Sequence, residues 1–175
     1  MCAKNRLALL TTAIFVGAIA AVPLASAAPP EDACKLLTQA QVSAVLGVSM
    51  GAGSHVTPTY LKTCTWTPAD GGTKNRKTVT ISFQSADSFG AAKKLMEQSQ
   101  AMLKAEGDKG AGQFANASAS GIGDDAFYTS MGGNYTALLV KKRNTSFKVA
   151  IYGPLPVDEA KAMEKTLALE ALSTL

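Results

Sequence analysis

The chain has 175 residues, enough for one domain with a hydrophobic core. Its 17 basic and 13 acidic residues give a net charge of +4. The charge falls to +2 (15 basic against 13 acidic) without Lys4 and Arg6, which lie in a predicted export signal. So small a charge on an exported protein excludes nucleic acid as the expected partner. Short basic clusters at 74–77 and 141–143 are expected at strand ends, with contact to an anionic surface as the functional alternative.

Residues 1–27 have the features of a cleavable export signal. Lys4 and Arg6 form a basic start, residues 7–22 carry no charge, and residues 25–27 (Ala-Ser-Ala) are the small residues that signal peptidase accepts. We therefore expect cleavage after residue 27 and a single domain over residues 28–175. The mature protein is then expected in the periplasm or outside the cell, without a stable membrane anchor.

Two other interpretations of residues 1–27 are a transmembrane anchor and a lipoprotein leader. A transmembrane anchor is disfavoured because the apolar run of 16 residues at 7–22 is shorter than the roughly 20 that cross a bilayer. A lipoprotein needs small residues directly before the modified cysteine, whereas Cys34 follows Glu31, Asp32 and Ala33.

A short helix is expected over residues 38–46. Thr38 and Gln41 have the spacing of a capping box at its start. Gly47 favours the left-handed conformation that ends helices.

Two strands are expected next, at 60–67 and 77–84. Apolar and polar residues alternate in both, and the first alternation places Tyr60, Cys64 and Trp66 on one face. A turn of Pro, Asp and Gly between them predicts a hairpin.

The second half of the chain predicts a long helix to about residue 106, a surface loop at 107–123, and a terminal helix to about residue 173. Between loop and terminal helix, strands are expected at 125–130, 135–141 and 146–152. The buried face of the terminal helix is expected to comprise Ala160, Met163, Leu167 and Ala171. The order α-β-β-α-β-β-β-α predicts an α+β fold. We expect a two-layer sandwich in which an antiparallel sheet of about five strands has its helices packed on one face.

Cys34 and Cys64 are the cysteines that remain after removal of the signal. Thiols of an exported domain are oxidised, so we expect them to form a structural disulfide. Their spacing does not match the Cys-x-x-Cys pattern of redox-active pairs.

His55 is the single histidine of the chain and lies in a glycine-rich loop. Ser54 is its neighbour, but no acidic residue close in sequence orients the ring, so a nucleophilic triad is not expected. One histidine and two oxidised thiols are also too few for the usual zinc site, and we expect neither a metal nor a cofactor.

Gly121, Gly123, Asp124 and Asp125 form a glycine–acid segment before a strand. A dinucleotide-binding loop would link a strand to a helix, and a calcium loop would need more oxygen ligands. We expect a structural turn in which Asp124 or Asp125 accepts hydrogen bonds from local backbone amides.

Several aromatic residues lie in the expected strands. Most are expected in the core, but if they share an open sheet face they would line a binding groove. The candidate ligand-face residues are Tyr60, Trp66, Tyr128, Tyr135 and Tyr152.

Three segments together resemble a group of small exported bacterial proteins of unknown function, which includes actinobacterial lipoproteins and extracellular sensor-like domains of bacterial kinases. They are Cys34-x-Leu-Leu-Thr38, Cys64-x-Trp66 and residues 121–126. The resemblance implies a Cys34–Cys64 disulfide, an α+β fold and a binding role without catalysis. The chain lacks the lipobox cysteine, the second disulfide of the sensor domains, and a kinase.

The preferred functional hypothesis is a secreted or periplasmic non-catalytic binding module for a small ligand, a polymer or a protein. We expect a monomer whose partner is an unidentified ligand or envelope protein. The alternative is an accessory protein that docks on a larger exported complex. A hydrolase with His55 as its base is the third hypothesis.

Overall fold

The computed structural model describes residues 32–71, 76–105, 117–130 and 135–175. The predicted signal and most of the predicted 107–123 loop lie outside these residues. None of the helices in the described ranges is both long enough and apolar enough to cross a membrane.

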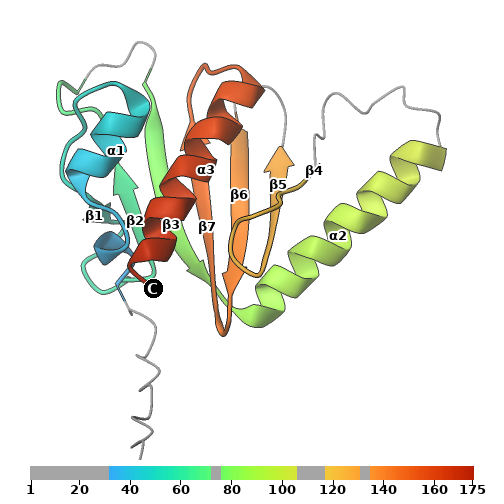
Figure 1. The fold of residues 1–175 in the computed structure, drawn as a ribbon. Coiled ribbons are helices and arrows are strands. Elements are labelled where there is room, and N and C mark those ends of the chain that lie inside the picture. The colour runs from blue at the N-terminus through green and yellow to red at the C-terminus, as the bar shows by residue number, and fades with distance from the viewer. Residues whose placement is uncertain (1–31, 72–75, 106–116, 131–134) are drawn as a thin grey trace, which may run out of the picture.

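The described residues form one antiparallel sheet with helices on both faces (Figure 1). The helices are η1 (Ala33–Lys35, a 3-10 helix), α1 (Gln39–Leu46), α2 (Ala86–Ala105) and α3 (Val157–Ser173). The strands are β1 (Ser54–His55), β2 (Thr63–Trp66), β3 (Thr78–Gln84), β4 (Ala117–Ser118), β5 (Asp125–Ser130), β6 (Tyr135–Lys142) and β7 (Thr145–Tyr152). Their spatial order is β1-β2-β3-β7-β6-β5-β4, so the pairing of β3 with β7 joins the two halves of the chain.

The α+β class and the antiparallel sheet are as predicted, but the sheet has seven strands where about five were expected. The two additional strands, β1 and β4, have two residues each and occupy the sheet edges. Two residues are too few to show an alternating pattern, so the sequence predicts loops in both segments. The predicted order α-β-β-α-β-β-β-α therefore lacks β1, β4 and η1.

The prediction that all helices pack on one face is wrong. Strand residues alternate between the faces of a sheet. Ala126, Leu138 and Val140 pack in the core under α1 and α3, whereas Phe127 and Leu139 pack with Phe89 of α2. Hence α2 lies on the opposite face. Two apolar residues of α2 are largely exposed: Leu95 (65% exposed) and Met102 (69% exposed).

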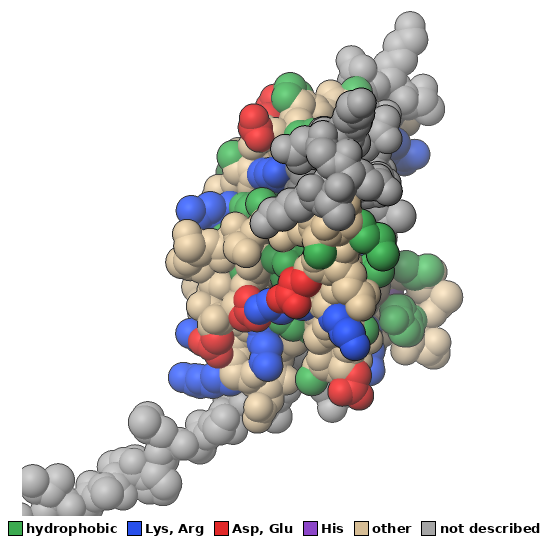
Figure 2. All heavy atoms as spheres, turned by 90° about the vertical axis from the view of Figure 1, so that its right-hand side faces the viewer, with side chains coloured by type: hydrophobic (Ala, Val, Ile, Leu, Met, Phe, Trp, Pro, Cys, Tyr) green, Lys and Arg blue, Asp and Glu red, His purple; other side chains and the backbone are tan. Residues whose placement is uncertain are grey.

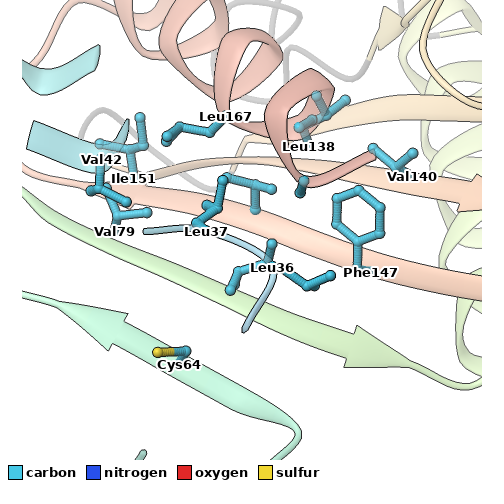
Figure 3. Packing of buried hydrophobic residues seen from close by; sticks show 14 of the residues in the cluster. Leu36, Leu37, Val42, Cys64, Val79, Leu138, Val140, Phe147, Ile151 and Leu167 are labelled. Atoms are coloured by element: carbon cyan, nitrogen blue, oxygen red, sulfur yellow. The ribbon is translucent and has the colours of Figure 1, made fainter. Parts of the chain in front are cut away.

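The main core lies between the sheet and the layer formed by η1, α1 and α3. Figure 3 shows Leu167 of α3 directed toward the strands, from which Leu138 and Ile151 point up to meet it. Leu36 and Leu37, between η1 and α1, fill the same layer. These side chains are 0–2% exposed.

Local signals fix where α1 begins and ends, as predicted. The Gln41 N–H donates to Thr38 Oγ1 (3.2 Å), and the Thr38 N–H donates to Gln41 Oε1 (2.8 Å). Gly47 ends the helix with a φ of 67°. The capping box stabilises the short helix by satisfying backbone donors that have no partner within it.

The Cys34–Cys64 disulfide ties η1 to β2. Cys64 is fully buried and Cys34 is half-buried. A backbone hydrogen bond from Ala33 N–H to Leu61 O (2.8 Å) fastens the same junction. The disulfide therefore connects the start of the helical layer to the sheet.

Replacement of both cysteines (Cys34→Ala with Cys64→Ala) is expected to lower the free energy of unfolding by roughly 3–4 kcal/mol. The reason is that the unfolded chain loses a closed loop whose ends are 30 residues apart. Urea unfolding of the oxidised wild type, the reduced wild type and the double variant measures this. Equal stability of all three proteins, or a free thiol titrated in the denatured, unreduced wild type, would contradict the structural role.

Candidate functional site

One part of the sheet presents hydroxyl and aromatic side chains on the face opposite α1 and α3. The strand register places these residues together: the half-buried Thr63, Thr65, Thr78, Thr80, Tyr135 and Lys148, the exposed Tyr152, and the buried Ser82, Ala137 and Ala150. We call this surface the threonine–tyrosine face. Of the described helices, α1 and α3 cover the other face, whereas α2 shares this face and packs beside these residues, on Phe127 and Leu139.

The threonines of this surface lie in rows across neighbouring strands. Thr65 is opposite Thr80, which in turn is opposite Ala150 of β7. The Oγ1 atoms of Thr65 and Thr80 are 3.3 Å apart, within hydrogen-bond distance. Thr63, Thr65, Thr78 and Thr80 are each half-buried, while Ala137 and Ala150 between the tyrosine pair and the threonine rows are buried. The result is a surface of small side chains with regularly spaced hydrogen-bonding groups.

Tyr135 and Tyr152 form the aromatic part of the surface. They are cross-strand partners on β6 and β7, with ring centroids 5.0 Å apart and a tilt of 43°. Burial raises the pKa of the Tyr135 hydroxyl to about 12, and the neighbouring Tyr152 adds to this. Tyr152 is 41% exposed, so one ring of the pair is open to a partner.

The five predicted ligand-face aromatics do not share a face. Trp66 is 1% exposed in the main core, on the helix-covered side. Tyr128 is on that side too, where its hydroxyl donates to Lys161 O (3.2 Å). Tyr60 is 50% exposed but lies in the loop before β2, outside any strand. The structure brings together Tyr135 and Tyr152.

A buried carboxyl group lies behind the tyrosine pair, on the helix-covered side. Glu164 of α3 is 0% exposed, and its Oε1 accepts hydrogen bonds from Thr136 Oγ1 (2.9 Å) and from Ile151 N–H (3.3 Å). Its Oε2 has no hydrogen-bond partner among the residues that the structure describes. Thr136 and Ile151 are the sequence neighbours of Tyr135 and Tyr152. The carboxyl group and the aromatic pair therefore share two strand segments.

The surroundings of Glu164 favour its neutral form. Burial raises the pKa of the Glu164 carboxyl from 4.5 to about 8, although the two hydrogen bonds and the charge of Lys161 act in the opposite direction. A cavity of about 10 Å³ lies next to its donors, lined in part by Tyr135, Thr136 and Ile151. This is room for about one water molecule.

Sequence reasoning missed Glu164, although a signal was present. The predicted buried stripe of α3 runs through Ala160 and Leu167, and Glu164 lies four residues after the first and three before the second. Positions with this spacing share a helix face. A carboxylate on an apolar stripe is rare unless it has a particular role.

His55 has an acidic partner, contrary to expectation. Its Nε2 is 3.3 Å from Asp32 Oδ1, and its Nδ1 is 3.0 Å from Thr63 O and 3.7 Å from Cys34 Sγ. Asp32, 23 residues earlier, arrives there because the disulfide and the Ala33–Leu61 hydrogen bond fold η1 onto β2. Sequence proximity could not reveal this pair.

The geometry around His55 offers neither a nucleophile nor a complete metal site within the described ranges. The contacts of its ring are a carboxylate, a backbone carbonyl and a disulfide sulfur, none of which is a hydroxyl or thiol that a base activates. Donor atoms of Asp32, Cys34 and His55 lie within 4.8 Å of one another. However, the sulfur is bonded to Cys64, which leaves two ligands where zinc sites use three or four.

The glycine–acid segment before β5 forms a turn, but its hydrogen bond is not local. Asp124 Oδ2 accepts from the Arg143 N–H (2.6 Å), and its Oδ1 is 3.3 Å from Lys142 Nζ. The Arg143 amide, helped by Lys142, lowers the pKa of the Asp124 carboxyl. Asp125 instead pairs with Lys93 of α2. Asp124 thus connects the turn to the β6–β7 hairpin.

Charged side chains of both signs are interspersed on the side of the molecule that carries α2. Figure 2 shows no broad area of one sign among its coloured residues. The Lys93–Asp125 and Lys142–Asp124 pairs neutralise part of this charge. The surface therefore does not have the uniform charge expected of a site for polyanions.

Comparison with known proteins gives a single finding. The family model described as "Protein of unknown function (DUF3558)" matches residues 12–144. No curated protein and no solved structure matches the chain.

Two glycines of the turn before β5 provide a matched pair of variants. Gly121 and Gly123 both have positive φ angles (75° and 61°). A Cβ at Gly121 would meet nothing within 4 Å, whereas one at Gly123 would lie 2.5 Å from Lys141 O. Gly121→Ala should cost about 1 kcal/mol of stability, and Gly123→Ala should cost at least about 1–3 kcal/mol more. Urea unfolding that finds equal losses would contradict this packing.

The pKa of Glu164 predicts how stability depends on pH. Because the folded protein binds this proton more tightly than the unfolded chain, the stabilisation is complete below pH 4.5 and is lost as the pH rises through about 8. Each pH unit in this window should lower the free energy of unfolding by up to about 1.4 kcal/mol. Glu164→Gln should remove this slope. Urea unfolding between pH 5 and pH 9 tests the prediction, and parallel curves for the two proteins would refute it.

Proposed function

We propose that this chain, which belongs to the DUF3558 family, is an exported non-catalytic binding module. In this proposal the threonine–tyrosine face binds an extended, uncharged polymer such as a glycan. The observation that carries the proposal is a sheet surface of half-buried threonines beside the Tyr135–Tyr152 pair, on the side opposite α1 and α3.

The chemistry of this surface suits a neutral partner rich in hydroxyl groups. Threonine hydroxyls both donate and accept hydrogen bonds, so they can match the hydroxyls of a sugar chain. Tyrosine rings offer a large apolar surface with a polar end and lose little conformational entropy on binding. Among the residues that make up the threonine–tyrosine face, Lys148 is the charged one.

The shape of the surface favours an extended ligand over a small molecule. Sites for small molecules enclose about 300–1,000 Å³, whereas the cavity behind the tyrosine pair measures about 10 Å³. The threonine–tyrosine face spans four neighbouring strands, β2, β3, β7 and β6. A polymer can contact several strands at once and gain affinity from many weak contacts.

Export and the absence of catalysis are parts of the same proposal. The Cys34–Cys64 disulfide supports an oxidising compartment, as does the signal-like composition of residues 1–27. The His55–Asp32 pair supports a structural role for the histidine, because its ring contacts hold the start of η1 against the β1–β2 hairpin.

Docking on a larger exported complex is the second candidate function. It is favoured by α2, which extends beyond the edge of the sheet (Figure 1). Leu95 and Met102 on this helix are 65% and 69% exposed. Large exposed apolar side chains on a projecting helix are a feature of protein–protein contact surfaces.

Co-sedimentation with insoluble cell-wall glycan tests the first proposal. We expect the wild type to bind and Tyr152→Ala to bind at least about fivefold more weakly, because truncation of an aromatic contact costs more than roughly 1 kcal/mol. Leu169→Ala is the matched control: Leu169 is 44% exposed, close to the 41% of Tyr152, but belongs to α3.

The controls separate the two candidate functions. If neither the wild type nor a variant binds glycan, the polymer proposal fails. If Leu95→Gln with Met102→Gln abolishes a protein cross-link that Tyr152→Ala leaves intact, the docking function replaces it.

A further inference from the structure

We propose that Glu164 is a pH-dependent latch that controls the threonine–tyrosine face from behind. This regulation rests on the function proposed above. In its neutral form Glu164 holds the paired ends of β6 and β7 against α3, and in its ionised form it releases them. Acidic conditions would therefore fix the aromatic pair, and alkaline conditions would loosen it.

The carboxyl group of Glu164 contacts both strands that carry the tyrosine pair. One oxygen of Glu164 receives hydrogen bonds from both strands, through Thr136 Oγ1 of β6 (2.9 Å) and Ile151 N–H of β7 (3.3 Å). Thr136 and Ile151 are themselves cross-strand partners. Glu164 thus bridges the two strands and fastens both to α3.

The unpaired oxygen explains why ionisation would be disruptive. A buried carboxylate needs partners for both oxygens, and Oε2 has none among the described residues. The nearby cavity, lined in part by the donors Thr136 and Ile151, measures about 10 Å³, room for about one water and too little to hydrate an anion. The ionised carboxylate becomes hydrated only when α3 and the strand ends separate and water reaches it.

The neighbouring charged and titratable groups leave Glu164 as the group that responds near neutral pH. Lys161 of α3 is the nearby cation, and its Nζ lies 5.6 Å from the centre of the Tyr128 ring. Tyr128 of β5 and Tyr135 of β6 have raised pKa values, so both stay neutral in this range.

The other charged and titratable groups around this layer do not contact the Glu164 carboxyl group in the described structure. Near the start of α3, Lys77 Nζ is 3.9 Å from Glu159 Oε1. His55 lies on β1 at the far edge of the sheet, away from Glu164. Tyr152 of β7 points to the opposite face with Tyr135.

The alternation of the strands transmits the effect to the binding surface. Thr136 follows Tyr135 directly, and Ile151 precedes Tyr152 directly, so each latch residue and its tyrosine point to opposite faces of the same strand. Loss of the Glu164 bonds frees the backbone that sets the position of both rings. The expected consequence is weaker binding at the face as the pH rises.

Amide hydrogen exchange tests the latch without any ligand. The measurement follows the amides of Thr136, Ile151 and Tyr152 between pH 5 and pH 9, corrected for the intrinsic pH dependence of exchange. In the wild type, local opening should increase up to tenfold per pH unit and level off near pH 8, because one proton is released on opening. In Glu164→Gln it should not change with pH. The amides of Val79 and Ile81 in β3 are the internal control.

A second variant keeps the test decisive if Glu164→Gln folds poorly. Thr136→Val removes one hydrogen bond that favours the ionised carboxyl, so opening should level off at a higher pH than in the wild type. Opening that is independent of pH in the wild type, or equally pH-dependent in Glu164→Gln, would overturn the latch. These outcomes concern the latch alone, whereas failure to bind glycan at any pH rejects the proposed function and leaves the exchange result standing.

Discussion

The pairing of β3 with β7 is the constraint on which the rest of the structure depends. It joins Thr78–Gln84 to Ser146–Tyr152, two segments separated by all of α2 and three strands. Its register aligns Val79 and Ile81 with Ile151 and Val149, which places these apolar residues together in the main core. The same register aligns Thr78 and Thr80 with Tyr152 and Ala150 on the other side. A shift by one residue would exchange the two faces, so the buried core also specifies which residues form the threonine–tyrosine face.

The two faces of the sheet are coupled at one end by a polar group. Glu164 occupies a position that an apolar residue would fill at less cost, because a buried carboxyl whose Oε2 has no partner within the described part of the chain destabilises the folded state. Its hydrogen bonds go to residues adjacent to Tyr135 and Tyr152. A group that costs stability and contacts the backbone of the candidate site has the properties expected of a functional residue.

The sequence could predict those features that local patterns determine. The capping box at Thr38 and Gln41, the stop at Gly47 and the alternation of β3 all depend on neighbouring residues, and the structure agrees with them. The expectation that one sheet face is free of helices led to the wrong position for α2. The continuous apolar run at 137–140 was the signal against it, because such a run indicates a strand that is covered on both faces. The Asp32–His55 pair and the Asp124–Arg143 hydrogen bond join residues 23 and 19 positions apart, so only the assembled fold reveals them.

Hydroxyl-radical footprinting in intact cells tests the central claim most directly, because it needs no knowledge of the ligand. Tyr152 and Tyr60 are similarly exposed, at 41% and 50%, but only Tyr152 belongs to the threonine–tyrosine face. The account predicts that Tyr152 reacts more slowly in cells than in the purified protein, while Tyr60 reacts equally in both. Equal reactivity of Tyr152 in cells and in the purified protein would contradict the assignment of this face as the binding surface.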